Sequence, residues 1–195
     1  RSRIKMQVLE KRGNLSMGNA QQIVGHSDTR EKDDFYATPS ESTSALLNVE
    51  EFVGGIYEPC CGQGHIATVL EDEGYEVEAS DLIDRGYGTP RIDFLMERTK
   101  RDNIVTNPPY KNALDFAEQA ITLSKRKVAL LLKLNFLEGV ARHKFFKEHP
   151  PKTVWVFSQR QSLMKNGTPY SGGMMALAWF VWEQGNNEQP RIGWI

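Results

Sequence analysis

The 195-residue sequence has no long apolar run. No stretch approaches the roughly 20 consecutive apolar residues that a membrane-spanning helix requires, and no charged-then-apolar leader marks a secretory signal. We therefore expect a cytoplasmic protein that has no membrane partner.

The sequence has only two cysteines, and they are adjacent, at Cys60 and Cys61. A disulfide between neighbouring residues would be strained, so we expect free thiols in a reducing compartment. No Cys-x-x-Cys pattern or matching histidine spacing accompanies them, although such patterns are typical of metal sites. We therefore expect no metal.

Two signatures of common nucleotide cofactors are also missing. The segment Glu58–Gly64 lies between a strand-like and a helical stretch, which is the order that opens a nucleotide-binding βαβ unit. Gly62 and Gly64 permit positive φ and close approach of the backbone to a ligand. The segment has no third glycine of a dinucleotide fingerprint and no Lys-Ser/Thr of a phosphate loop, which argues against NAD and ATP. Glu58 suits instead a ligand that carries an ammonium group.

Net charge is only −1, but its distribution is uneven. Residues 31–97 contain 16 acidic and three basic side chains, whereas residues 98–165 contain 14 basic and five acidic ones. A basic second half is compatible with binding to a phosphate backbone, and equally with cations scattered over solvated helices. The sequence leaves both interpretations open.

Length and hydrophobic pattern predict a single α/β domain with seven strands. We place this domain at residues 33–185, a C-terminal tail at residues 186–195 and a flexible arm at residues 1–32. A DNA-contacting arm or an added leader are alternatives for residues 1–32. The predicted strands lie around residues 54–57, 75–80, 92, 103–106, 128–132, 153–157 and 176–183.

Helix signals separate these strands. Thr38, Pro39 and Glu41 match a capping box with proline at the first helical position, which predicts a helix over residues 39–48. Phe35 and Tyr36 precede it, where they either cover a ligand or staple the helix start. Further helices are predicted from residue 66 to 73, from residue 113 to 121 and from residue 139 to 149.

Two predicted strands end in acids. Asp81 lies 17 residues beyond Gly64, at the carboxyl end of the second strand, where an acid usually binds a ribose diol. Asp93 and Phe94 follow the third strand, where they offer a hydrogen bond and an apolar face to an adenine ring. Without the neighbouring motifs, Asp93 would be an ordinary loop acid.

The tetrapeptide Asn107–Tyr110 follows the fourth strand. Two consecutive prolines cannot continue a central strand, so the backbone leaves the sheet as a stiff lip. The lip holds the Asn107 amide, the Pro108 carbonyl and the Tyr110 ring in fixed relation, which suits a flat molecule with an amino group. Taken alone, an Asn-Pro turn is an equally good interpretation.

Residues 158–173 form a long polar segment between the sixth and seventh strands. Loops of this length are uncommon in compact domains unless they are functional. We predict substrate contact and lid motion, with a plain connector as the alternative. The predicted substrate-binding residues are Tyr110, Lys111, Arg160, Lys165 and Tyr170.

Five segments together resemble the S-adenosylmethionine-dependent N6-adenine DNA methyltransferases, and the chain is most similar to small, phage-type members. These segments are Phe35–Pro39, Glu58–Gly64, Asp81, Asp93–Phe94 and Asn107–Tyr110. The acidic-Pro-x-x-Gly-x-Gly turn followed by Asn-Pro-Pro-Tyr is a specific signal. The resemblance implies a class I fold, which is a doubly wound, Rossmann-like, mostly parallel sheet with an antiparallel last strand. It also implies S-adenosyl-L-methionine as cofactor, DNA as partner, and a bacterial or phage-infected host cytoplasm.

The resemblance also implies a role for each position. The catalytic residues are Asn107, Pro108, Pro109 and Tyr110. The cofactor-binding residues are Phe35, Tyr36, Thr38, Pro39, Glu58, Pro59, Cys60, Gly62, Gly64, Asp81, Leu82, Asp93, Phe94 and Asn107.

The chain departs from this family in one respect. Members often carry a separate region that recognises the target sequence, whereas only about ten residues follow the last predicted strand here. We therefore expect weak or short sequence specificity, or dependence on a partner or on residues 158–173. The same lip also resembles enzymes that methylate adenine or guanine in RNA, or a protein glutamine. A further alternative is a binding module without turnover. The sequence leaves open whether the protein is a monomer or a weak dimer.

Overall fold

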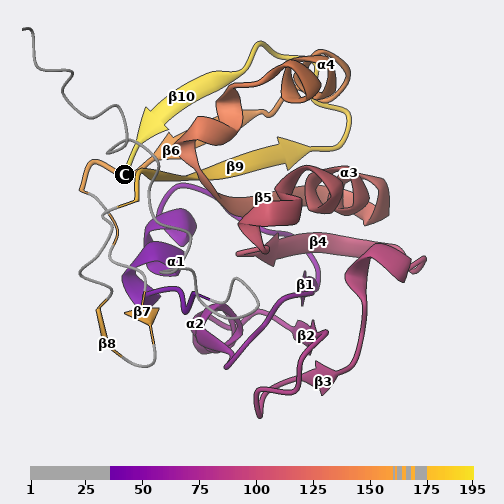
Figure 1. Ribbon diagram of the computed structural model, residues 1–195, viewed down its shortest axis with the longest axis vertical. Helices are drawn as coiled ribbons and strands as arrows, with labels where there is room; N and C mark the ends of the chain where they lie inside the picture. The colour runs from indigo at the N-terminus through magenta and orange to yellow at the C-terminus, as the bar shows by residue number, and fades with distance from the viewer. Residues whose placement is uncertain (1–35, 160, 162–163, 166–167, 170–174) are drawn as a thin grey trace, which may run out of the picture. The chain divides into compact units, whose positions relative to one another are not determined.

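Short apolar segments form a sheet of eight strands in the described residues of the computed structural model (Figure 1). The structure describes residues 36–195 except 160, 162–163, 166–167 and 170–174. The strands in chain order are β1 (Ile56–Glu58), β2 (Val77–Asp81), β3 (Thr89–Pro90), β4 (Arg101–Thr106), β5 (Ser124–Lys133), β6 (Thr153–Val156), β9 (Leu177–Glu183) and β10 (Arg191–Trp194). Their order across the sheet is β10-β6-β9-β5-β4-β1-β2-β3. The arm predicted at residues 1–32 lies outside the described residues.

The predicted fold class is confirmed, with one additional strand. All neighbouring strands pair in parallel except β9, which is antiparallel to both β5 and β6. Strand β10 lies within the predicted C-terminal tail and pairs in parallel with β6. It is only four residues long and follows a polar stretch, so its pairing with an edge strand leaves little trace in the sequence. The third strand is also displaced, because β3 is Thr89–Pro90 and Ile92 lies beyond it.

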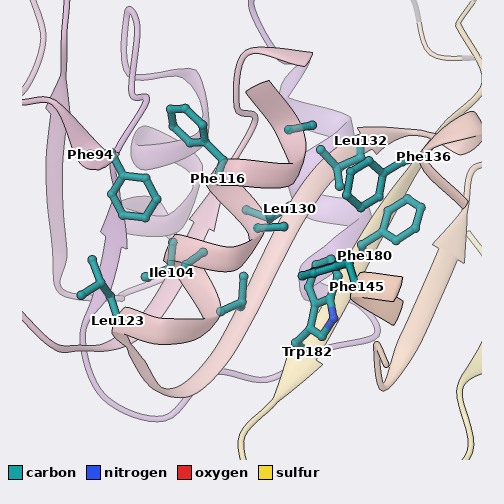
Figure 2. Close-up of a cluster of buried hydrophobic side chains, with 14 of the residues drawn as sticks. Phe94, Ile104, Phe116, Leu123, Leu130, Leu132, Phe136, Phe145, Phe180 and Trp182 are labelled. Carbon is teal, nitrogen blue, oxygen red and sulfur yellow. The ribbon is translucent and has the colours of Figure 1, made fainter. Parts of the chain in front are cut away.

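Two layers of helices cover the sheet. Helices α1 (Ser40–Leu47) and α2 (His65–Asp72) pack on one face, and α3 (Ala113–Leu123) and α4 (Val140–Glu148) pack on the other. Strand β5 is buried on both faces, since Val128, Leu130 and Leu132 belong to one cluster and Ala129 and Leu131 to the other. Figure 2 shows the cluster under α3 and α4. This burial explains why the apolar run in β5 could be identified from the sequence.

Three 3₁₀ turns connect the sheet to its helices. These are η4 (Phe94–Met96), η5 (Tyr110–Asn112) and η6 (Leu134–Leu137). Part of the predicted loop at residues 158–173 is a two-stranded antiparallel sheet of β7 (Met164–Lys165) and β8 (Thr168–Pro169). Gln161, before these strands, bridges to Met175 and accepts a hydrogen bond from Ser42 of α1 at 2.9 Å. Among the described residues, no helix is long and apolar enough to cross a membrane.

Candidate active site

A pocket of about 300 Å³ lies where the carboxyl ends of β1, β2 and β4 meet. The strand order reverses between β1 and β4, and ligands of open α/β sheets bind at such a point. Predicted site residues that line the pocket are Tyr36, Thr38, Glu58, Pro59, Cys60, Asp81, Leu82, Asp93, Phe94, Asn107 and Pro109. Pro39, Gly62, Gly64, Pro108, Tyr110 and Lys111 are not among its lining residues.

The glycine turn after β1 is tied to the acid that ends β2. Gly62 and Gly64 have φ values of 55° and 84°, which favour glycine at both positions. The Gly62 N–H donates to Oδ2 of Asp81 at 2.8 Å, and the Ile83 N–H donates to Oδ1 at 2.8 Å. Each carboxylate oxygen can accept a further hydrogen bond. Asp81 is therefore held in a fixed orientation and can still bind hydroxyl groups.

Gly64 allows a close approach by another side chain. A Cβ atom at Gly64 would lie 2.5 Å from the Tyr87 ring, whose hydroxyl donates to Glu71 on α2 at 2.9 Å. The sequence predicted that the glycines would admit a ligand to the backbone. On the side of Gly64 where a Cβ atom would lie, the neighbour is Tyr87, which comes from the loop after β2 and is not marked by any motif.

Glu58 is a buried carboxyl group at the end of β1. Glu58 is 1% exposed, and its Oε2 has no hydrogen-bond partner among the described residues. Burial raises the pKa of Glu58 to about 8, while a hydrogen bond from the Ala67 N–H lowers it and the negative charges of Asp81 and Glu71 raise it. A cation placed in the pocket would favour the ionised form. The predicted ammonium site is thus chemically suited to a positive group.

The two cysteines are free thiols. Burial raises the pKa of Cys60 well above its ordinary value and that of Cys61 to about 12. Both thiols are therefore neutral at physiological pH, and neither is an activated nucleophile. In the part of the chain that the structure describes, no group of three or more His, Cys, Asp or Glu could hold a metal ion.

The side chain of Asn107 is oriented by the segment before α1. Its Nδ2 donates to the Tyr36 carbonyl at 3.2 Å and to Oγ1 of Thr38 at 3.1 Å. Because a carbonyl can only accept, the amide nitrogen must face Tyr36. Oδ1 of Asn107 is then left as an acceptor, and it is buried without a hydrogen-bond partner among the described residues.

This arrangement corrects the predicted capping box. Helix α1 begins at Ser40 with Pro39 at the N-cap position, and no side chain caps its first turn. Thr38 is 3% exposed and uses its hydroxyl to accept from Asn107. A contact between residues 69 positions apart cannot be inferred from a local pattern, so the sequence favoured the cap.

Tyr110 begins η5 and packs beside the lip. Its ring is stacked with that of Tyr36, with centroids 6.1 Å apart and an interplanar angle of 23°. Nζ of Lys133, the last residue of β5, lies 4.8 Å from the centroid of the Tyr110 ring. Tyr36 therefore contacts the lip twice, through the Asn107 amide and through the Tyr110 ring.

Asp93 and Phe94 have structural roles as well as lining the pocket. Oδ1 of Asp93 accepts from the Leu95 N–H at 3.0 Å and so caps η4. Phe94 is 2% exposed, and the centroid of its ring lies 5.4 Å from that of Phe116 (Figure 2). Phe94 is thus a core residue that reaches the pocket.

Several lining residues were not predicted. They are Ala37, Cys61, His65, Ile66, Ile83, Arg85, Ile92, Leu95, Asn112 and Phe116. His65 follows Gly64 at the start of α2, and its place directly after the glycine turn could have marked it as a lining residue. Arg85 and Ile83 lie in the loop after β2, where no periodicity marks them. Phe35, Arg160 and Tyr170 lie outside the described residues, and Lys165 is described only as part of β7.

Comparison with known proteins identifies the fold. No protein-family model matches the chain, and no curated protein sequence matches it. A proposed RNA methyltransferase of Pyrococcus horikoshii superposes with a TM-score of 0.61 at 15% identity, over 80% of this chain and 90% of that one. A predicted O-methyltransferase of Agrobacterium tumefaciens gives a TM-score of 0.52 at 12% identity, over 80% and 85% of the two chains. The chain has the Rossmann-like fold of class I methyltransferases.

Proposed function

We propose that the protein transfers a methyl group from S-adenosyl-L-methionine to the N6 amino group of adenine in DNA. The observation that carries the proposal is the orientation of Asn107. Both its amide hydrogens are donated to Tyr36 and Thr38, so the side chain offers only an oxygen to a partner. An acceptor in that position selects a methyl acceptor that carries N–H groups, such as an exocyclic amine.

The pocket residues fit the proposed cofactor. The buried, unpartnered Oε2 of Glu58 is suited to the ammonium group of the amino acid end. The fixed carboxylate of Asp81 is suited to a ribose diol. Apolar lining from Phe94, Leu95 and Ile92 is suited to an adenine ring. When bound, the cofactor supplies an electrophilic methyl group.

The lip prepares the amine for attack. Oδ1 of Asn107 and the Pro108 carbonyl accept hydrogen bonds from the amine, which favours a tetrahedral nitrogen and directs its lone pair away from the ring. This assistance consists of positioning and electrostatics. Tyr110 stacks on the target base after the base has rotated out of the duplex. No strong general base is required, because the amine proton becomes acidic once the nitrogen carries the methyl group.

The choice of DNA over RNA rests on the family resemblance, because basic residues attract the phosphates of both. An amino group on RNA or a glutamine amide would satisfy Asn107 in the same way, since both are planar and conjugated. The basic half of the chain favours nucleic acid over a protein glutamine.

Incubation with methyl-labelled cofactor and separate DNA, RNA and protein acceptors tests the proposal. We expect label in DNA, at N6 of adenine after digestion to nucleosides. Label in RNA or protein alone would contradict the DNA assignment. The absence of label in all three would contradict the enzymatic function.

A further inference from the structure

Helix α4 lies at one side of the molecule next to β9 and β10 (Figure 1), and several of its side chains are exposed. Its inner face packs in the core through Phe145 (Figure 2). The ring centroid of Phe136 lies 6.3 Å from that of Phe145 and 5.5 Å from that of Phe180. Helical spacing brings residues at i, i+3, i+4 and i+7 to one face. On the outer face of α4 these residues are Val140, His143, Lys144 and Lys147, all exposed.

The turn before α4 connects this row to the lip. Lys133 lies against the Tyr110 ring, and η6 begins at the next residue. Leu137 follows Lys133 by four residues, a span of about 14 Å at most. Leu137 and Val140 are 43% and 92% exposed. Leu137 is thus exposed within about 14 Å of the residue that lies against Tyr110, and the exposed Val140 follows it by three residues.

Three cations of the basic half, at the amino ends of β4 and β5, are paired with acids, at N···O distances of 2.6, 2.8 and 3.4 Å. These pairs are Arg101–Glu78, Lys127–Glu50 and Lys125–Asp102. They neutralise the edge of the sheet that lies opposite the pocket.

The cations of α4 are less neutralised. Lys147 has no ion pair among the described residues, and Lys144 lies 3.9 Å from Glu148, with both side chains well exposed. Glu138 and Glu148 are the acids that flank the row. An exposed ion pair at this distance contributes little to stability, so Lys144 can exchange Glu148 for a phosphate.

We propose that the outer face of α4, together with Leu137, is a contact surface for double-stranded DNA. This inference rests on the proposed function and names the form of its substrate. Lys144 and Lys147 bind phosphates of one strand, because the row from Val140 to Lys147 is about 10 Å long and spans several phosphates. Leu137 and Val140 fill the space that the rotated base leaves in the stack, a role that only a duplex requires.

The phosphate contacts are tested by the salt dependence of DNA binding. The variant Lys144→Gln/Lys147→Gln should reduce the slope of log Kd against log salt by about 2 for a duplex, at about 0.9 per phosphate contact. The control Lys125→Gln/Arg126→Gln removes the same charge at the amino end of β5 and should leave the slope unchanged. Equal slopes for the two variants would overturn the surface. A loss confined to duplex RNA would overturn DNA as the partner.

The apolar contacts are tested by comparing substrates. Val140→Ser, at a fully solvated position, should lower kcat/KM about tenfold on duplex DNA and less than twofold on the same sequence as a single strand. Equal losses on both substrates would overturn the filling role. Binding is measured without turnover, so the two proposals fail separately. Normal methylation with unchanged slopes rejects the surface, and altered slopes without any methylation reject the proposed function alone.

Discussion

At the scale of single residues, Asn107 carries the proposed chemistry. Asn107→Ala removes the acceptor that orients the amine while leaving Glu58 and Asp81 in place. We therefore expect turnover to fall by at least about 100-fold, as for loss of a preorganised hydrogen-bonding group, with cofactor affinity within about threefold. Single-turnover methylation and calorimetric titration with S-adenosylhomocysteine measure the two effects. A comparable loss of cofactor affinity would show that Asn107 is structural.

In the proposed reaction, Thr38 acts through Asn107. Thr38→Val keeps the shape of the side chain but removes the acceptor for Nδ2, so the amide is less well held. We expect kcat to fall about tenfold, which corresponds to one lost hydrogen bond of about 1.4 kcal/mol, with KM for DNA nearly unchanged. Thr38→Ser retains the hydroxyl and should restore kcat. Failure of serine to restore kcat, or a change in KM alone, would argue against this positioning role.

At the scale of elements, the sequence predicted the segments whose pattern is local. The buried run in β5, the strand that ends before Asn107 and the helix α4 all carry their signal within a few residues. Contacts across the chain were missed, because Thr38 pairs with Asn107 and Tyr87 covers Gly64 over separations that no periodicity records. The pocket was predicted through residues at strand ends, whereas Arg85 comes from an irregular loop.

Strand β10 offers a test of an element that the sequence did not indicate. A Cβ atom at Gly193 would lie 2.1 Å from the Trp155 ring, so a side chain there must displace the ring or the strand. We expect Gly193→Ala to lower the free energy of unfolding by about 1–3 kcal/mol, as overpacking does, with kcat unchanged because β10 is at the sheet edge beyond β6. Gly55→Ala is the control, since the nearest atom to its Cβ is 3.7 Å away, and should cost less than about 0.5 kcal/mol. Urea denaturation measures both losses of stability, and equal losses in Gly193→Ala and Gly55→Ala would contradict the packing of β10.

At the scale of the whole molecule, Glu58 links protons to stability and to ligand binding. Its carboxyl group has a pKa of about 8 in the folded protein and an ordinary value of 4.5, so the folded state binds the extra proton between these values. The stability contribution of this group is full below pH 4.5 and is lost as pH rises towards 8. Glu58→Gln cannot lose a proton, so its stability relative to the parent protein should improve steadily from pH 5 to pH 8. A constant difference in unfolding free energy between the two proteins across that pH range would contradict the raised pKa.

The same linkage reverses sign for a cationic ligand. An ammonium group favours ionised Glu58, so binding of S-adenosylhomocysteine should release a proton below pH 8. Its affinity should therefore rise by about tenfold per pH unit between pH 6 and 7.5, and the slope should disappear in Glu58→Gln. Calorimetric titration in two buffers of different ionisation enthalpy counts the protons directly. An unchanged slope in the variant would show that Glu58 does not contact the ammonium group of the ligand.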